Sequence, residues 1–149
     1  MKKLAIIGAS YLQEPIVKKA KQMGIYTICF AWADGATCAE ICDKFYDISI
    51  IEKEQILEIC KKEQIDGITT IASDTATLTV NYVASRMGLI SNPDEYSEIC
   101  TNKFKMRQCF MDADVPSPKF TLVDDEGKYS INANSTSKCK ITKCFCKST

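Results

Sequence analysis

A glycine follows the first apolar segment, at the place where a nucleotide-binding fold would hold phosphate groups. The run Lys3–Ile7 leads into Gly8, and Ala, Ser, Tyr and Leu separate this glycine from Gln13. A helix that begins after such a loop offers backbone N–H groups to anions. The loop keeps only the first glycine of G-x-G-x-x-G, and the next predicted strand ends at Trp32 without the acid that binds ribose. The pattern therefore does not favour a dinucleotide site.

Polar and aromatic residues follow several predicted strands. Ser73-Asp74-Thr75 ends one strand and opens a helix, while Trp32 and Asp34 follow another. The carboxyl ends of parallel strands meet at one edge of a sheet, where open α/β folds bind ligands. Ser73 and Asp74 are equally the residue types of a helix N-cap, and Trp32 could serve packing alone. Asp34 could join this cleft, for which we otherwise predict six residues: Gly8, Ser10, Gln13, Trp32, Ser73 and Asp74.

Other chemistry is limited by composition. The chain has no histidine, which excludes the Ser-His and Cys-His nucleophile pairs and the hydrolase triads built on them. Its nine cysteines include no Cys-x-x-Cys pair, so we interpret most of them as reduced core thiols. Cys139, Cys144 and Cys146 lack an obvious fourth ligand, and we predict no metal site.

Strands and helices alternate along the first 90 residues. Apolar runs predict strands, and apolar residues at helical spacing predict the intervening helices. This alternation predicts an α/β fold, a Rossmann-like three-layer parallel sheet with helices on both faces. The expected strands are Lys3–Ile7, Tyr26–Ala31, Phe45–Ile48 and Ile68–Ala72. The expected helices cover 12–23, 38–42, 52–63, 74–87, 94–100 and 102–113.

Charge and hydropathy exclude some partners. Lys plus Arg and Asp plus Glu both number 19 in a chain of 149 residues, which gives no argument for nucleic acid. No apolar run is long enough to cross a membrane, and we expect a cytoplasmic protein. An isolated strand is expected at 119–123. Residues 124–149 are expected to form a basic, disordered tail, since 128–149 hold five lysines and no acid.

The order of these segments resembles the N-terminal portion of ATP-grasp ligases, above all the carbamoyl-phosphate-synthase-like and biotin-carboxylase-like members. The resemblance covers about residues 2–123. It rests on a succession of short segments: Leu4-Ala5-Ile6-Ile7-Gly8, Lys21-Gln22-Met23-Gly24-Ile25, 39–46, Ile65-Asp66-Gly67-Ile68, Met87-Gly88-Leu89 and Thr101-Asn102-Lys103 through Pro118. It implies a pre-ATP-grasp domain at 1–93 and the incomplete start of an ATP-grasp domain at 94–123.

The resemblance also implies where nucleotide would be held. Asn102-Lys103 matches the pair that opens the ATP-grasp domain, so Lys103 would reach the ATP phosphates; a solvated lysine in a first helical turn is the alternative. Lys143 lies near the expected second phosphate lysine, but Cys144-Phe145-Cys146 stands where the glycine-rich loop should begin, and no glycine follows Gly127. The family's magnesium ligands have no counterpart here. ATP and Mg²⁺ are cofactors of the full-length family, and we expect this chain alone to bind neither.

The chain is therefore interpreted as the truncated N-terminal part of an ATP-grasp carboxylate–amine ligase, inactive alone. Full-length relatives act on a small-molecule carboxylate. Two alternatives stay open: a stand-alone module that pairs with a separate ATP-grasp chain, and a nucleotide-binding Rossmann domain of unrelated function. A second copy of the chain is a further candidate partner.

Overall fold

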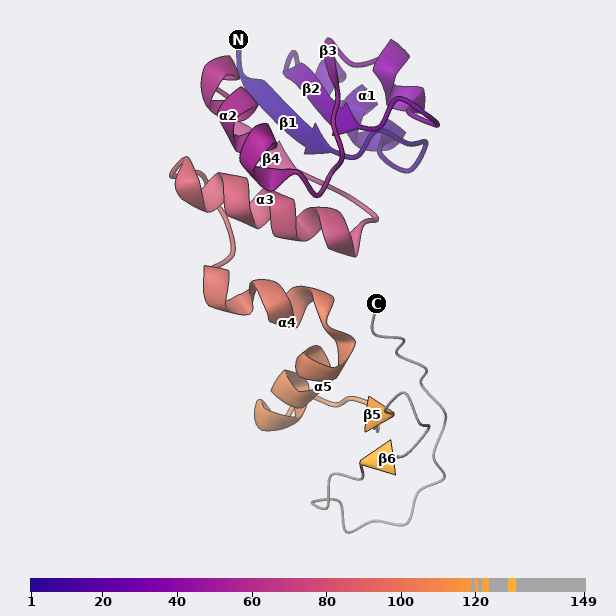
Figure 1. Cartoon of the computed structure of the whole chain (residues 1–149), viewed down its shortest axis with the longest axis vertical. Coiled ribbons are helices and arrows are strands. Elements are labelled where there is room, and N and C mark those ends of the chain that lie inside the picture. The colour runs from indigo at the N-terminus through magenta and orange to yellow at the C-terminus, as the bar shows by residue number, and fades with distance from the viewer. Residues whose placement is uncertain (119, 121, 124–128, 131–149) are drawn as a thin grey trace. The chain divides into compact units, whose positions relative to one another are not determined.

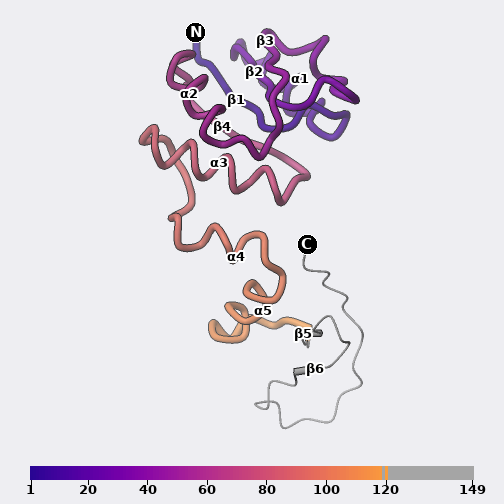
Figure 2. Tube along the Cα trace, in the orientation of Figure 1, coloured from indigo at the N-terminus to yellow at the C-terminus, as the bar shows by residue number. Residues whose placement is uncertain are grey.

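The structure is a computed structural model that describes residues 1–118, 120, 122–123 and 129–130. The chain divides into two compact units, of which the first is Met1–Ser97 and the second begins at Glu98. Figure 2 follows the Cα trace through both. Each unit is described separately below.

The first unit is built on a four-stranded sheet. Its strands are β1 (Lys3–Ile7), β2 (Tyr26–Ala31), β3 (Lys44–Asp47) and β4 (Gly67–Thr69). They are ordered β3-β2-β1-β4, and every neighbouring pair is parallel. β1 lies in the interior of the sheet, where Ile6 is in register with Cys29 of β2 and with Thr69 of β4. The predicted parallel sheet is confirmed.

Alternate residues of β1 and β2 are buried on opposite faces of the sheet. Ala5 and Ile7 of β1 pack in one apolar cluster with Phe30 of β2, whereas Ile6 packs in another with Cys29. All five side chains have no exposed surface. A strand buried on both faces is apolar along its whole length, which is why these two strands read as continuous apolar runs.

Helices cover both faces of this sheet (Figure 1). Helix α1 (Glu14–Gln22) and the 3-10 helix η1 (Thr37–Glu40) supply Val17 and Cys38 to the Ile6 cluster. Helices α2 (Lys53–Glu63) and α3 (Asp74–Arg86) supply Ile56 and Val83 to the Phe30 cluster. The fold is thus the predicted three-layer arrangement.

Several elements differ from the sequence prediction. The helix expected at 94–100 is a 3-10 turn followed by a short helix, and the strand expected at Phe45–Ile48 begins and ends one residue earlier. Two further differences lie at the carboxyl edge of the sheet. The strand expected at Ile68–Ala72 ends at Thr69, because the Thr70 hydroxyl donates to the Ile7 carbonyl at 2.7 Å and Ala72 adopts a left-handed φ of 57°. The helix expected at 38–42 is a single 3-10 turn at Thr37–Glu40. Both corrections lie at loops that follow the carboxyl ends of strands.

Beyond α3 the chain forms the 3-10 turn η2 (Asp94–Tyr96) and the short helix α4 (Ser97–Thr101). In the second unit, helix α5 (Lys103–Asp112) is followed by β5 (Leu122–Val123) and β6 (Tyr129–Ser130), which pair antiparallel. Phe104 and Phe120 meet edge to face, with ring centroids 5.4 Å apart. The strand expected to be isolated is therefore paired, and its partner lies within the expected tail; the rest of that tail is outside the described residues.

The six cysteines that the structure describes carry free thiols, and Cys29, Cys38 and Cys60 are buried. Within this part of the chain, no cluster of three metal-binding side chains occurs. None of the helices described has the length and apolar character required to cross a bilayer. Cys139, Cys144 and Cys146 fall outside the described residues.

Candidate functional site

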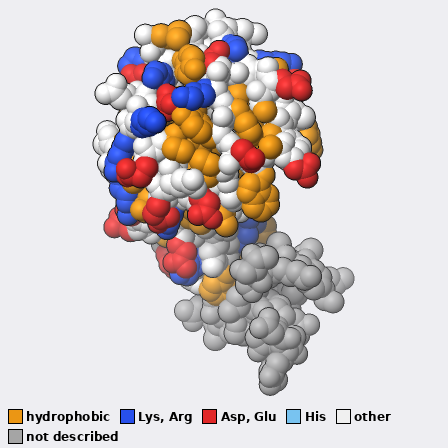
Figure 3. All heavy atoms as spheres, turned by 45° about the horizontal axis from the view of Figure 1, so that its top comes forward, with side chains coloured by type: hydrophobic (Ala, Val, Ile, Leu, Met, Phe, Trp, Pro, Cys, Tyr) orange, Lys and Arg blue, Asp and Glu red, His pale blue; other side chains and the backbone are white. Residues whose placement is uncertain are grey.

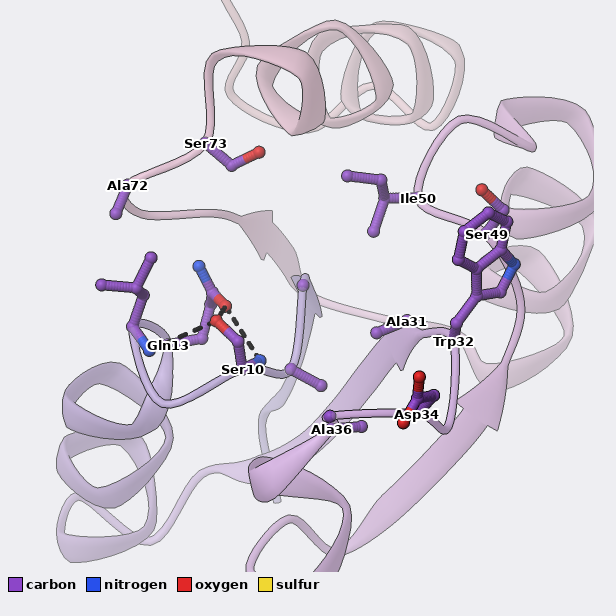
Figure 4. Close-up of a pocket in the computed structure, with 14 residues that line it drawn as sticks. Ser10, Gln13, Ala31, Trp32, Asp34, Ala36, Ser49, Ile50, Ala72 and Ser73 are labelled. Carbon is purple, nitrogen blue, oxygen red and sulfur yellow. Dashed lines mark hydrogen bonds between the residues drawn. The ribbon is translucent and has the colours of Figure 1, made fainter.

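A cavity of about 370 Å³ opens at the carboxyl edge of the sheet. Its walls come from the segments that follow all four strands, as Figure 4 shows. Ser10 and Gln13 lie on one side in this view, Trp32 and Ser49 lie on the other, and Ser73 approaches from the start of α3. The lining residues are Gly8, Ala9, Ser10, Leu12, Gln13, Ala31, Trp32, Asp34, Gly35, Ala36, Ser49, Ile50, Ala72 and Ser73.

The strand order explains why a cavity forms here. The chain leaves β1 through α1 on one face of the sheet, and it leaves β4 through α3 on the other face. Because β1 and β4 are neighbours, the two outgoing segments diverge and leave a crevice between them. Open parallel sheets bind ligands at such switch points. The position of the cavity therefore follows from the topology.

The segment after β1 turns sharply at Gly8. Its φ of +99° is one that side chains with a β-carbon rarely adopt. The Gly8 N–H donates to the Phe30 carbonyl at 2.8 Å, which extends the pairing of β1 with β2 by one residue. The chain then enters α1 through Gln13, whose side chain turns back toward the glycine.

The side chain of Gln13 is buried and joins two walls of the cavity. Its Oε1 accepts hydrogen bonds from the Ser10 amide at 3.0 Å and from the Ser10 hydroxyl at 2.8 Å. Its Nε2 donates to the Ile71 carbonyl at 2.6 Å. One amide group thus fixes the segment after β1 to the segment after β4. Ser10 and Gln13 act together as the frame of the cavity.

The segment after β2 presents Trp32 and Asp34. Both are exposed, and 69% of the Trp32 surface is accessible. The loop is held by β3, because the Ala33 amide donates to the Asp47 carboxylate at 2.8 Å. The Ala36 amide donates to the Ala33 carbonyl at 3.2 Å and closes a turn. An accessible indole and carboxylate are therefore carried on a loop with defined anchors.

The segment after β4 is shaped by Ala72 and Ser73. A non-glycine residue at a φ of 57° costs about 1 kcal/mol or more, and such strain concentrates at functional sites. Ser73 is the N-cap of α3, and its hydroxyl accepts from the Ala76 amide at 3.3 Å. The capping role that the sequence left open is thus observed, and it coexists with a place in the cavity wall.

The structure brings together five of the six predicted cleft residues, namely Gly8, Ser10, Gln13, Trp32 and Ser73. Asp74 lies in the first turn of α3 and does not line the cavity. Sequence reasoning missed Ser49 and Ile50, which follow β3. The rule that found Ser73, a small polar residue just after a strand, also applies to Ser49, which directly follows the strand expected at Phe45–Ile48.

Neither of the two lysines predicted to bind phosphate is among the described residues that line the cavity. Lys103 is exposed at the first position of α5 in the second unit, and the preceding Asn102 caps that helix by accepting from the Lys105 amide at 3.1 Å. Lys103 thus lies in the first turn of a helix, as in the alternative interpretation given for it above. Lys143 is outside the described residues.

The cavity wall carries little charge. Among the described residues that line it, Asp34 alone is ionisable, and none is Lys or Arg. Alanine, leucine, isoleucine and tryptophan supply apolar surface, while serine hydroxyls and the Gln13 amide supply hydrogen bonds. Pockets of this composition hold small molecules by shape and a few polar contacts.

No family model matches the chain, and no curated protein matches it either. Solved structures do match. Phosphoribosylglycinamide synthetase from Anaerococcus prevotii is 24% identical with a TM-score of 0.71, and it covers 84% of this chain. N5-carboxyaminoimidazole ribonucleotide synthetase from Thermotoga maritima is 25% identical with a TM-score of 0.69, over 84% of this chain.

A third match is the biotin carboxylase domain of the Hydrogenobacter thermophilus 2-oxoglutarate carboxylase, solved with MgADP. It is 15% identical with a TM-score of 0.64 and covers 78% of this chain. The chain spans 32%, 34% and 28% of the length of these three structures. All three are ATP-grasp enzymes. The resemblance seen in the sequence is confirmed, and the chain has the fold of the N-terminal part of these ligases.

Proposed function

We propose that this chain is the substrate-binding N-terminal part of an ATP-grasp carboxylate–amine ligase of the carbamoyl-phosphate-synthase-like kind. One observation carries the proposal: a cavity framed by Gly8, Ser10 and Gln13 lies at the switch point of a fold shared with such ligases. In this proposal residues 1–93 form the pre-ATP-grasp domain, and residues 94–123 belong to the start of the ATP-grasp domain.

The described residues do not fit an ATP–magnesium site. The cavity has no lysine or arginine in its described wall, and the described chain holds no cluster of metal-binding side chains. Phosphoryl transfer needs a phosphate cradle and a carboxylate-held metal. No step of that chemistry is therefore assigned to these residues. Their part is to bind a small molecule and to orient it.

In a complete ligase, an ATP-grasp domain would supply the ATP-dependent activation of a carboxylate that an amine then attacks. We propose that the cavity described here holds one of the two condensing partners, while an ATP-grasp domain supplies the nucleotide. The same division of labour holds if that domain is carried by a separate chain. The isolated chain is expected to bind its substrate without turning it over.

The proposal is tested by locating bound ligand on the chain itself. Amide signals of the ¹⁵N-labelled chain are followed while small amines, amino acids, carboxylates and ribose 5-phosphate are added. We expect at least one compound to shift the signals of residues 8–13 and 72–73 together. Gln13→Ala, which removes the side chain that joins these segments, should weaken that response. If every compound in the panel leaves these signals unchanged, the cavity is not a substrate site.

A further inference from the structure

We infer that this cavity selects an unphosphorylated substrate that carries a primary amine, bound in its positively charged form by Asp34 and Trp32. The inference rests on the proposed function, because it takes the cavity as the substrate site. It adds the sign of the ligand's charge and the residues that recognise that charge.

Three backbone N–H groups of the loop after β1 are already engaged in hydrogen bonds within that loop. Phosphate-binding loops use unpaired backbone N–H groups. Here the Ser10 amide donates to Gln13 Oε1 at 3.0 Å, the Leu12 amide to the Ser10 hydroxyl at 3.3 Å, and the Gln13 amide to the Ser10 carbonyl at 3.0 Å. A phosphate could take these donors only by displacing Ser10 or Gln13 from contacts that frame the cavity.

The described wall of the cavity includes an acidic residue and no basic one. Asp34 is the one ionisable residue among the described residues of the wall, so no described cation there compensates a phosphate. The matched synthetases of A. prevotii and T. maritima bear phosphoribosyl and ribonucleotide compounds in their names. The wall of this cavity indicates a different ligand. A carboxylate at the mouth of an otherwise uncharged pocket attracts a cation.

Asp34 shares its loop with an aromatic residue, Trp32. Trp32 lies two residues before Asp34 on the same anchored loop, and both line the cavity. An ammonium group is attracted by the face of an indole as well as by a carboxylate. Ile50, after β3, and Leu12, after β1, offer apolar surface to the rest of the ligand. The Thr79 hydroxyl fixes Ile50 by donating to its carbonyl at 2.6 Å. A primary amine with a small apolar substituent would place its ammonium group at Asp34 and Trp32 and its substituent against Ile50 and Leu12.

The chain offers a built-in reporter for this site, because Trp32 is its single tryptophan. We would follow Trp32 fluorescence while adding L-leucine amide, which is cationic at neutral pH, and N-acetyl-L-leucine amide, which is neutral. L-leucine amide should bind more tightly. Asp34→Asn should weaken its binding by up to about fivefold, the upper end for one solvent-exposed charge pair, and leave the neutral compound unchanged. Glu54→Gln, at an exposed carboxylate of α2 outside the cavity, is the matched control and should change neither.

The outcomes separate this inference from the proposed function. If ribose 5-phosphate shifts the amides of 8–13 and binds more tightly than L-leucine amide, the inferred sign of the ligand's charge is wrong although the cavity is a substrate site. Equal affinities of Asp34→Asn and the unmodified chain for L-leucine amide would overturn the role of Asp34. If no compound shifts the amides of 8–13 and 72–73, the proposed function itself fails. Circular dichroism of Asp34→Asn verifies that the variant is folded.

Discussion

Gly8 and Gln13 occupy adjoining space, so that a β-carbon placed on Gly8 would lie 3.0 Å from Cδ and 3.1 Å from Oε1 of Gln13. Glycine is required at position 8 for two reasons: the backbone has a positive φ, and the Gln13 side chain leaves no room for a β-carbon. Gln13 in turn holds Ser10 and the Ile71 carbonyl. The frame of the cavity therefore depends on a residue without a side chain.

Gly8→Ala should destabilise the chain more than the same change at Gly24. Both glycines have positive φ values, +99° and +71°, but a β-carbon at Gly24 meets nothing within 4 Å. The backbone term is about 1–2 kcal/mol at either site, and the crowding against Gln13 adds about 1–3 kcal/mol at Gly8. Urea unfolding of the two variants measures the difference. Equal losses would mean that Gln13 moves aside freely.

Gln13→Met should lower the free energy of unfolding by about 1–3 kcal/mol. The substitution keeps the length of the side chain but leaves the Ile71 carbonyl without the donor that Gln13 Nε2 provides. Gln22→Met, at an exposed position of α1, is the control and should be nearly neutral. A Gln13→Met variant as stable as the Gln22 control would show that the hydrogen bonds of Gln13 contribute nothing to stability.

Glu63 should make the stability of the first unit depend on pH. The Lys44 ammonium, at 2.5 Å, and the Tyr46 hydroxyl, at 2.6 Å, hold the pKa of the Glu63 carboxyl below its ordinary value of 4.5. A lowered folded-state pKa contributes stability that is present above pH 4.5 and is lost as the pH falls through the folded value.

The variant Glu63→Gln tests this contribution. It should cost about 1 kcal/mol at pH 7, since Lys44 is partly solvated, and should flatten the loss of stability as the pH falls below 4.5. Urea unfolding at several pH values provides the curve. Glu58→Gln, which alters a surface ion pair with Lys61, should leave the curve unchanged. An acid limb of the same steepness in Glu63→Gln would assign the pH dependence to other groups.

Cys60 and Cys29 should resist alkylation in the folded chain. Burial raises the pKa of the Cys60 thiol to about 12, and burial together with the neighbouring Cys42 raises that of Cys29. Iodoacetamide attacks the thiolate, so both should stay unmodified at pH 8 while the partly exposed Cys100 and Cys109 react. Peptide mass spectrometry with and without urea gives the pattern. Rapid native labelling of Cys60 would mean that α2 opens readily.

ATP with magnesium should give no measurable heat when titrated into the isolated chain. Micromolar affinity needs about 8 kcal/mol, and one exposed charge such as Lys103 supplies roughly 0–1 kcal/mol. Lys103→Ala is the matched variant. Micromolar binding that this variant abolishes would show that the chain retains a nucleotide site of its own. ATP-dependent activity on adding a protein that carries an ATP-grasp domain would support the division of labour proposed above.

The sequence predicted the central strands of the sheet better than the frame of the cavity. The bounds of β1 and β2 agree with the structure because both strands are buried on two faces, which makes them uninterrupted apolar runs. β3 and β4 have no fully buried residue, and their ends were misplaced. Short strands at the margins of a sheet leave a weaker apolar signal.

At the cavity, the strand-end rule located Ser10, Gln13 and Ser73 but not what they contact. Gln13 and Ile71 are 58 positions apart in the sequence, and no local pattern encodes a hydrogen bond over that separation. The left-handed conformation of Ala72 could not be predicted from the sequence either, because alanine rarely adopts a positive φ. On the face of the molecule shown in Figure 3, hydrophobic side chains lie beside charged ones.

The interior position of β1 has a consequence for the order in which this unit assembles. Lys3 pairs with Tyr26 soon after it in the chain, but the partner of Leu4 on the other side is Gly67. Closing the longer loop is entropically costlier, so we expect the β1–β2 ladder to form early and the β1–β4 ladder to form late. The crevice between β1 and β4 exists only after that last step. A ligand bound across it joins the earliest and the latest segments of the folding reaction, and it should slow the unfolding of the whole unit.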